Sequence, residues 1–375
     1  MKFAIITHAV HKIKDGQIYS YEPYVREMNL WAKYVDEIII LAPISNEEIT
    51  DIETSYCHSN IKVVAIPNFD ITSIKNLLKS LLVIPQICGL IYKVMKQVDH
   101  IHLRCPGNIG LLGSLVQILF PSKPKTAKYA GNWDPNSQQP ITYKFQKWLL
   151  GSPFLTKNMK VLVYGDWPNQ TKNIVPFFTA SYHQSEIEEI PVKTFEKKIK
   201  LVFVGGFTEG KQPLLSVQSA HELIKKGYDI SLDLYGGGVK REEIENYIEL
   251  HKLDNHIILH GNVNKDEVKK AFIDAHFLIF ISKSEGWPKV VAEAMFWGCL
   301  PISTDISCVQ DMLGNNSRGS LLKPDANADT IATEIKSYLA DENKYLEKVV
   351  EAKKWSQKYT LETFEGAVKE LLKNE

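Results

Sequence analysis

Short runs of apolar, β-branched residues alternate with helix-like segments along the whole chain of 375 residues. Strands that are covered on both faces read as continuous apolar runs, and their alternation with helices is typical of a parallel sheet. The sequence therefore predicts an α/β fold. The expected strands are 3–7, 37–42, 62–66, 100–103, 127–130, 160–164, 200–204, 231–235, 256–260, 277–281, 300–303 and 319–322, and the expected helices include 23–34 and 74–97.

The alternating strands and helices form two groups along the chain, and a polar stretch rich in Glu and Lys at 181–198 joins them. Two groups of this length predict two Rossmann-like, doubly wound domains that face a cleft, one over 1–185 and one over 193–355. The segment 352–372 is helical by pattern and precedes no further strand. We therefore expect the C-terminal helix, about 356–375, to cross back to the first domain.

Composition excludes several classes of protein. The 44 basic and 44 acidic side chains cancel, so the chain has no global positive field for nucleic acid. The five cysteines are widely spaced and form no CxxC, which argues against a disulfide framework or a zinc site. No stretch has the roughly 18 uncharged apolar residues that a membrane-spanning helix needs. The apolar start is too short for a signal peptide, so we expect a cytoplasmic protein.

The junction at 282–302 carries the strongest functional signal. Pro288 is suited to the first position of a helix, and Gly298 to the position just after its end. The free amides of Lys289 and Val290 would then form an anion site at a positive helix end. Ligands bind at such strand-to-helix junctions in open α/β sheets.

Two glutamates belong to this junction. Glu293 is the only charge in an otherwise apolar helix, where a carboxylate needs hydrogen-bond donors such as sugar hydroxyls. Glu285 stands eight residues earlier, in the loop. The alternative is that Glu293 pairs with a nearby lysine and that Glu285 is solvated.

Two glycine-rich junctions precede this one. Gly205-Gly206 ends a strand and Lys211 follows, so a ligand phosphate could approach the backbone and meet the lysine. Three glycines, 236–238, follow the next strand and could face a base or ribose. Neither stretch satisfies the P-loop or GxGxxG pattern, and plain connecting turns remain an alternative for both.

Taken together, these motifs resemble family 4 retaining glycosyltransferases of the GT-B type (glycosyl transferases group 1). The resemblance covers roughly 199–370. It rests on FVGG followed by lysine, LYGGG, LHGNV at 259–263, Glu285-x7-Glu293, GSLLKPD at 319–325 and YTLETFE at 359–365.

The resemblance implies a nucleotide-sugar site in the C-terminal domain. Glu285 would bind the transferred sugar, Glu293 the ribose, and Lys211 with the loop amides the diphosphate. The family usually has arginine at the position of Gly206, so a rearranged diphosphate site is expected here. The implied donor-binding set is Gly205, Gly206, Lys211, Gly236, Gly237, Gly261, Asn262, Val263, Glu285, Gly286, Trp287, Lys289, Val290 and Glu293.

Breaking a glycosyl–phosphate bond builds negative charge on the phosphate, which amides and a lysine can stabilise without a metal. The sequence has no Asp-x-Asp, the ligand pair that Mg²⁺ would require. We therefore expect a metal-independent transferase that needs no cofactor. The resemblance implies that it moves a hexose from a nucleoside diphosphate sugar to a saccharide or lipid-linked acceptor in surface-polysaccharide assembly. The alternatives are a GT-B-type epimerase or phosphorylase-like enzyme, and a weak transferase homologue that acts as a nucleotide-binding or scaffolding module.

The first domain is expected to bind the acceptor. His8, His11 and Gly16 lie in the loop after the first strand, Arg104 lies at another strand end, and Asn132 and Asp134 follow a third. Asp134 is the candidate for a catalytic, acceptor-orienting group, and the other five are acceptor-side candidates. A structural or solvated role is the alternative for the histidines and for Arg104.

Two stretches of the first domain, 73–96 and 143–160, mix lysines with apolar and aromatic residues. Such surfaces can lie on an anionic bilayer, which would place the protein at the inner membrane face. The alternative is an ordinary helix with solvated lysines.

Overall fold

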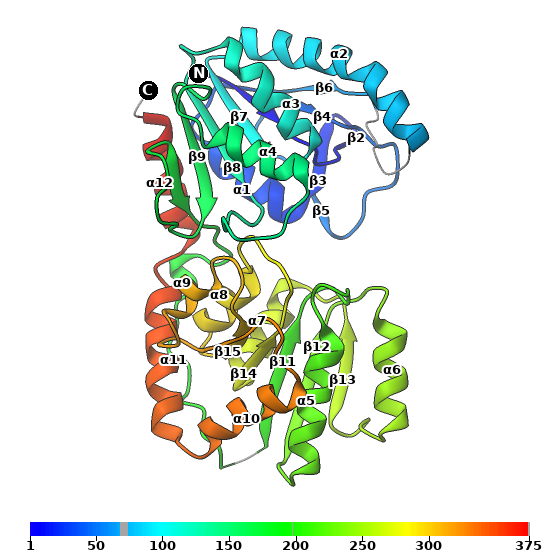
Figure 1. Cartoon of the computed structure of the whole chain (residues 1–375), viewed down its shortest axis with the longest axis vertical. Coiled ribbons are helices and arrows are strands. Elements are labelled where there is room, and N and C mark those ends of the chain that lie inside the picture. Colours follow the sequence, from blue (N-terminus) through cyan, green and yellow to red (C-terminus); the bar gives the residue numbers. More distant parts are fainter. Residues whose placement is uncertain (68–73, 197, 374–375) are drawn as a thin grey trace. The chain divides into compact units, whose positions relative to one another are not determined.

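A computed structural model describes residues 1–67, 74–196 and 198–373 of the chain, with the side chains of 74–82 outside that description. The chain forms two compact units, one made of Met1–Phe178 with Phe364–Glu375 and the other of Thr179–Thr363 (Figure 1). The stretch 179–192, expected to be the end of one domain and a linker, thus belongs to the second unit. Each unit is a parallel sheet with helices, which confirms the predicted fold class.

The first unit is built on a seven-stranded parallel sheet in the order β10-β9-β8-β7-β1-β4-β6. The order runs in opposite directions from β1 and from β7, so the switch point of the sheet lies between these two strands. The strands are β1 (Lys2–Ile6), β4 (Glu37–Ala42), β6 (Ile61–Ala65), β7 (His100–Cys105), β8 (Lys125–Tyr129), β9 (Met159–Tyr164) and β10 (Ile174–Phe177), and the helices are α1 (Glu22–Ala32), α2 (Ile74–Gln97), α3 (Asn108–Val116) and α4 (Ile141–Leu150).

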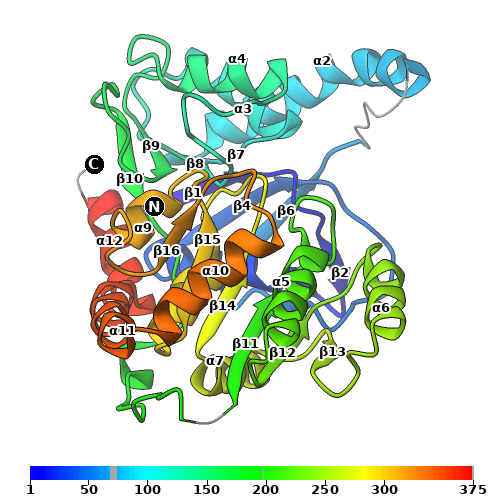
Figure 2. The same cartoon turned by 60° about the horizontal axis from the view of Figure 1, so that its bottom comes forward.

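The second unit has a six-stranded parallel sheet in the order β13-β12-β11-β14-β15-β16. Its helices α5 and α10 lie side by side (Figure 2). The strands are β11 (Ile199–Val204), β12 (Ile230–Tyr235), β13 (Ile257–Gly261), β14 (Phe277–Phe280), β15 (Leu300–Thr304) and β16 (Ser320–Leu322), and the helices are α5 (Pro213–Lys225), α6 (Arg241–Leu250), α7 (Lys265–Asp274), α8 (Lys289–Phe296), α9 (Val309–Leu313), α10 (Ala328–Leu339) and α11 (Glu342–Ser356).

Every strand expected from the sequence is present, because continuous apolar runs are what a sheet covered on both faces requires. The structure also contains a small antiparallel sheet that was not predicted, made of β2 (Lys12–Lys14), β3 (Gln17–Tyr21) and β5 (Glu53–Ser55). Asp15 and Gly16 make the two-residue turn between β2 and β3, and both have positive φ (51° and 76°). An Asp-Gly pair between alternating apolar residues is a strong hairpin signal.

The helix expected over 352–372 is interrupted. Helix α11 ends at Ser356, and helix α12 (Leu361–Lys373) begins after Thr360, whose Oγ1 accepts a hydrogen bond from the Thr363 amide at 3.2 Å. A threonine in that position caps the start of the second helix. The expected return of the C-terminal helix to the first domain is confirmed, since residues 364–375 belong to the first unit.

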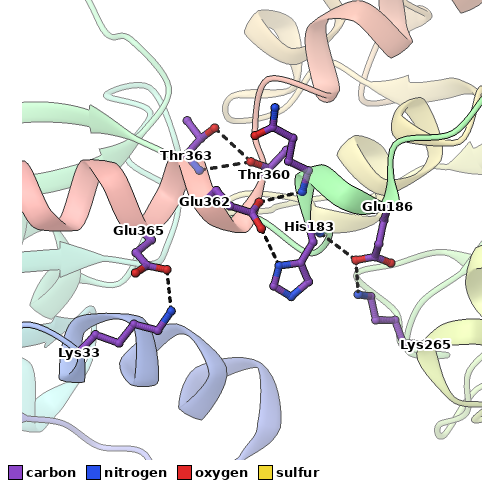
Figure 3. A network of polar contacts seen from close by, with 9 residues as sticks. Lys33, His183, Glu186, Lys265, Thr360, Glu362, Thr363 and Glu365 are labelled. Atoms are coloured by element: carbon purple, nitrogen blue, oxygen red, sulfur yellow. Dashed lines mark hydrogen bonds and ion pairs between the residues drawn. The ribbon is translucent and has the colours of Figure 1, made fainter.

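Two carboxylates of α12 illustrate this division (Figure 3). In the second unit, Glu362 accepts hydrogen bonds from His183 Nδ1 and from the Gln184 amide, both at 2.8 Å. In the first unit, Glu365 accepts from Lys33 Nζ at 2.7 Å and from the Tyr34 hydroxyl at 2.9 Å. The change from one unit to the other therefore falls between these two residues.

Two further structural findings bear on the sequence analysis. All five cysteines are free, as their spacing suggested. Among the described helices, none has the length and apolar character needed to cross a bilayer.

Candidate functional site

Most of the predicted donor-binding residues lie at one edge of the second unit's sheet. They follow the carboxyl ends of β11, β12, β13 and β14, where the chain leaves each strand for the next helix. In a parallel sheet these ends share one edge. The topology is therefore consistent with the predicted location of the candidate site, which is at the strand-to-helix junctions.

The two main catalytic candidates contact each other. Lys211 Nζ forms an ion pair with Glu285 Oε1, and Ser282 Oγ donates a second hydrogen bond to the same oxygen at 2.7 Å. The ammonium also lies 4.8 Å from the centre of the Phe280 ring. The Glu285 side chain is only 11% exposed, so the solvated alternative for this residue is wrong in this structure.

The loop that carries Glu285 is fixed at both ends. The Gly210 carbonyl accepts hydrogen bonds from the Lys283 amide at 2.8 Å and from Ser282 Oγ at 3.1 Å. The Gly286 carbonyl accepts from Ser307 Oγ at 3.0 Å and from the Cys308 thiol at 3.1 Å. The last two residues were not foreseen from the sequence, because they follow β15 and reach the loop only in the folded sheet.

Helix α8 starts one residue later than the sequence suggested. Pro288 has ψ near 90° and stands just before the helix, which begins at Lys289. The Val291 amide bonds back to the Pro288 carbonyl at 3.0 Å, whereas the amides of Lys289 and Val290 are in the first turn, where helix geometry provides no acceptor. Gly298 follows the helix with φ of 67°, as expected for the residue after a helix end.

Glu293 lies on α8 and is half-buried. Its Oε1 accepts a hydrogen bond from Ser181 Oγ. The alternative partner considered for this carboxylate was a lysine, and the observed one is a hydroxyl, which is the type of donor that a ribose also offers. Among the described contacts, Glu293 and Glu285 share no hydrogen-bonding partner.

The glycines after β11 and β12 divide into two kinds. A Cβ on Gly236 would lie 2.0 Å from the Gly205 carbonyl oxygen, and one on Gly238 would lie 2.6 Å from the Phe207 oxygen. These two glycines are needed because the two loops pack backbone against backbone. Gly206 and Gly237 have no neighbour closer than 3.7 Å to an added Cβ, so these two positions leave room beside the backbone.

The predicted base-binding residues are brought together. The Gly236 amide donates to the Gly261 carbonyl at 2.7 Å. The Asn262 side chain comes within 3.7 Å of a Cβ added at Gly237. Gly261 has φ of 75°, a conformation that favours glycine, and Val263 directly follows Asn262 in the same connection.

In the first unit, His8 lines a cavity of about 250 Å³ at the carboxyl edge of the sheet. The other lining residues are Pro43, Ile66, Pro67, Gly107, Asn108, Ile109 and Tyr143. Burial, together with the nearby positive charge of Arg104, lowers the pKa of His8. The cavity includes the first residue of α3, where free amides favour an anion.

The other acceptor-side candidates have structural partners. Arg104 forms an ion pair with the buried Glu27 at 2.5 Å and lies 5.1 Å from the centre of the Tyr24 ring. His11 is fully buried; its Nδ1 donates to the Ala9 carbonyl at 2.8 Å and its Nε2 accepts from the Tyr56 hydroxyl at 2.9 Å. Gly16 forms the hairpin turn described above.

Asn132 and Asp134 shape the loop after β8. Asn132 Oδ1 accepts from the Asp134 amide at 2.9 Å, and Asp134 Oδ1 accepts from the Asn136 amide at 2.8 Å. Both side chains thus form local turns. Lys147 Nζ donates to the Asp134 carbonyl at 2.9 Å and holds this loop to α4.

The model of the family "Glycosyl transferases group 1" matches residues 185–355. Residues 185–355 are therefore similar to the glycosyl transferases group 1 family. This matched region contains every donor-binding residue predicted from the sequence, from Gly205 to Glu293.

Curated relatives are similar to part of this chain. A poly(glycerol-phosphate) alpha-glucosyltransferase of Bacillus subtilis is 24% identical over 184 residues, which are 49% of this chain and 27% of that protein. A phosphatidylinositol N-acetylglucosaminyltransferase subunit of Schizosaccharomyces pombe is 29% identical over 105 residues, 28% of this chain and 23% of the relative. The matched part therefore spans about a quarter of these relatives.

Solved structures resemble the whole chain. Sucrose-phosphate synthase from Thermosynechococcus elongatus has a TM-score of 0.69 at 14% identity, with 100% of this chain and 98% of that one covered. HepE of Anabaena in complex with UDP and glucose has a TM-score of 0.67 at 12% identity, with coverage of 100% and 99%. At these identities the likeness shows the fold, which is the GT-B fold of two Rossmann-like domains.

Proposed function

We propose that this protein is a retaining, metal-independent glycosyltransferase. It would transfer a hexosyl group from a nucleoside diphosphate sugar to a saccharide or lipid-linked acceptor in surface-polysaccharide biosynthesis. The observation that carries the proposal is the ion pair of Lys211 with Glu285 at the carboxyl edge of the second sheet. At this edge Glu285 would supply a carboxylate for the hydroxyls of a sugar, and Lys211 would supply an ammonium group for a phosphate.

The proposed roles follow from the charges that develop during transfer. Cleavage of the bond between sugar and phosphate places negative charge on the departing diphosphate and positive charge on the sugar ring. Lys211 and the amides of Lys289 and Val290 in the first turn of α8 stabilise the first charge. Glu285 binds hydroxyls of the transferred sugar, and its ion pair with Lys211 opens or is shared when the donor enters.

Glu293 and the glycine loops complete the proposed donor site. The ribose would replace Ser181 as the hydroxyl donor to Glu293. Gly237, Gly261, Asn262 and Val263 would line the base. Gly206 leaves space where an arginine is usual in the family that the sequence resembles, so Lys211 carries more of the diphosphate charge.

The acceptor site is proposed at the carboxyl edge of the first sheet. The cavity beside His8 and the start of α3 accommodates part of a sugar or a phosphate. Asp134, in the neighbouring loop after β8, is the proposed acceptor-orienting group. A lipid-linked acceptor would place the protein at the inner face of the cell membrane.

A panel of UDP-, GDP- and ADP-sugars tests the donor site. A bound donor raises the apparent stability of the purified chain by mass action, and we expect one base to give the largest thermal shift. The anomeric configuration of the product, followed by NMR, tests retention, and unchanged turnover after EDTA treatment tests metal independence. Inversion or loss of turnover in EDTA contradicts the corresponding part of the proposal.

A second candidate function is a nucleotide-binding module with little or no turnover. Gly206 favours this candidate because the family that the sequence resembles usually has an arginine at this position. Donor hydrolysis with and without an acceptor mixture separates the two functions. A thermal shift without any turnover selects the binding module. Gly206→Arg is a useful companion variant because the position has room for a side chain, and a gain of turnover in it would identify the missing arginine as the cause.

A further inference from the structure

Helix α4 exposes large apolar side chains on the face that points away from the core. Ile141, Phe145 and Trp148 are 85%, 42% and 63% exposed, and their spacing of four and three residues places them on one side of the helix. The opposite side of α4 is buried through Gln146, Leu149 and Leu150. Phe154, in the turn after α4, is 76% exposed.

Two of these side chains contact each other. The rings of Phe145 and Trp148 stack with their centres 5.6 Å apart. Helix α4 lies next to α3, which lies next to α2, on one side of the sheet (Figures 1 and 2). We define the docking face as the exposed residues Ile141, Lys144, Phe145, Trp148, Phe154 and Lys157.

The segment of the chain that carries the docking face has charged side chains of one sign. Residues 135–165 contain four lysines and no aspartate or glutamate, in a chain that is neutral as a whole. Lys144 and Lys157 are exposed, and Lys157 Nζ lies 5.4 Å from the centre of the Phe154 ring. Large apolar side chains among lysines complement a surface that is apolar below and negatively charged above.

Helix α2, the other stretch singled out in the sequence, differs in its described part. Ile87, Ile91, Val94 and Met95 are buried in the core of the first unit. These apolar residues are therefore used in folding. Tyr92 of α2 is 41% exposed, and its ring lies against Phe120 with the ring centres 5.2 Å apart. The structure thus exposes four large apolar side chains on α4 and its following turn, and one among the described side chains of α2.

We infer that the docking face of α4 and its following turn binds the surface of an anionic lipid bilayer. Aromatic rings suit the boundary between headgroups and acyl chains, and lysines are attracted to anionic headgroups. An exposed apolar patch of this kind marks an interaction site. The lysine content selects an anionic membrane over a second copy of the chain, which would bring like charges together.

An anionic bilayer would be a partner of the proposed transferase, and binding to it can be measured independently of sugar transfer. Lys147, on the same helix, donates to the Trp133 and Asp134 carbonyls, each at 2.9 Å. Docking would therefore place the loop of Asp134 beside the bilayer, where a lipid-linked acceptor resides. This consequence depends on the proposed function, whereas binding to lipid does not.

The experiment is co-sedimentation of the full chain with phosphatidylglycerol-containing vesicles and with pure phosphatidylcholine vesicles. We expect binding to the first and little to the second. The variants are Trp148→Ser with Phe154→Ser, and Lys144→Glu with Lys157→Glu. Each pair should weaken partitioning by roughly tenfold or more, since each lysine contributes about 1 kcal/mol at an anionic surface and 1.4 kcal/mol is tenfold.

Matched controls lie on the second unit. Val239→Ser with Leu250→Ser removes side chains that are 88% and 76% exposed, and Lys323→Glu with Lys358→Glu reverses two exposed lysines. These controls should keep wild-type partitioning, and all variants should keep the wild-type circular dichroism spectrum and donor hydrolysis. Wild-type protein that does not bind anionic vesicles, or binds both vesicle types equally, overturns the inference. So do docking-face variants that retain binding, or that only abolish self-association measured by light scattering.

Discussion

Lys211 and Glu285 form an ion pair across 74 residues of sequence, in a loop that Ser282 also joins. The pair holds an ammonium group at the carboxyl edge of the sheet, next to the start of α8. The same second unit offers a comparison, because Lys283 and Glu209 form an exposed pair at 2.8 Å. One pair is half-buried at the proposed site, and the other is on the surface.

We predict that Glu285→Gln and Lys211→Met each lower turnover of the donor by at least roughly a hundredfold, the loss typical of removing one group that stabilises a transition state. Both variants should still fold, as judged by circular dichroism. Lys283→Met should keep turnover within about twofold, because exposed ion pairs contribute little. Near-normal turnover in both Glu285→Gln and Lys211→Met would refute the proposed function.

Two adjacent glycines should respond very differently to alanine. Gly236→Ala places a Cβ 2.0 Å from the Gly205 oxygen in a backbone with φ of 136°. We expect a loss of about 3 kcal/mol or more in the free energy of unfolding, measured in urea. Gly237→Ala meets only the Asn262 side chain at 3.7 Å and should cost less than about 1 kcal/mol. Equal losses would show that the two loops do not pack as described.

Glu27 is the carboxylate partner of two buried cations, Arg104 at 2.5 Å and Lys128 at 3.1 Å. Glu27→Gln leaves both cations without this carboxylate, and removing one member of a buried pair typically costs about 3–5 kcal/mol. Urea unfolding should reveal this loss. The matched control is Glu22→Gln on the same helix, where the pair with Arg26 is partly exposed and the expected cost is below about 1 kcal/mol. Equal stability of the two variants contradicts this account of the cluster.

Stability should fall on mild acidification. Burial lowers the pKa of His11 from 6.5 to about 4, so the unfolded chain binds a proton between these values that the folded chain does not. The free energy of unfolding should therefore decrease by about 3 kcal/mol from His11 alone between pH 6.5 and pH 4. Burial also lowers the pKa of His8 and His276, which adds to the same trend.

His11→Gln removes this proton linkage and keeps a polar side chain. Its unfolding free energy, measured by urea titration at several pH values, should depend less steeply on pH than that of the wild type. His183→Gln serves as the control, since that ring is 54% exposed. An unchanged slope in His11→Gln would mean that the ring is accessible to protons in the folded state.

The sheets could be predicted from the sequence because their strands are continuous apolar runs between helices. The hairpin at Asp15-Gly16 was missed even though its turn residues are a recognisable signal, since β2 and β3 are short and largely exposed. The candidate donor-site residues were expected at strand ends and most of them lie there, whereas their side-chain contacts were not predicted. Ser181 and Glu293 are 112 residues apart, and Glu27 and Arg104 are 77 apart.

Contacts between residues so far apart in the chain produce no repeating pattern in the sequence. A strand that carries Arg104 or Lys128 implies that some carboxylate must be near, because buried charge needs compensation. The sequence does not indicate which of many glutamates supplies it. The exposure of the apolar side chains of α4 could not be predicted from the sequence either. A helix that mixes apolar and basic residues has the same sequence pattern whether its apolar side chains are covered or not.

The return of α12 has a consequence for how the chain can be divided. The second unit is one uninterrupted stretch, whereas the first consists of a long piece and the last dozen residues. Phe364 lies in that short piece and is one of the aromatic residues around the fully buried Lys128. The Lys128 ammonium lies 4.9 Å from the centre of the Phe364 ring. A fragment that stops before Phe364 would open this enclosure to water, so such a truncation should destabilise the first unit although it leaves Met1–Phe178 intact.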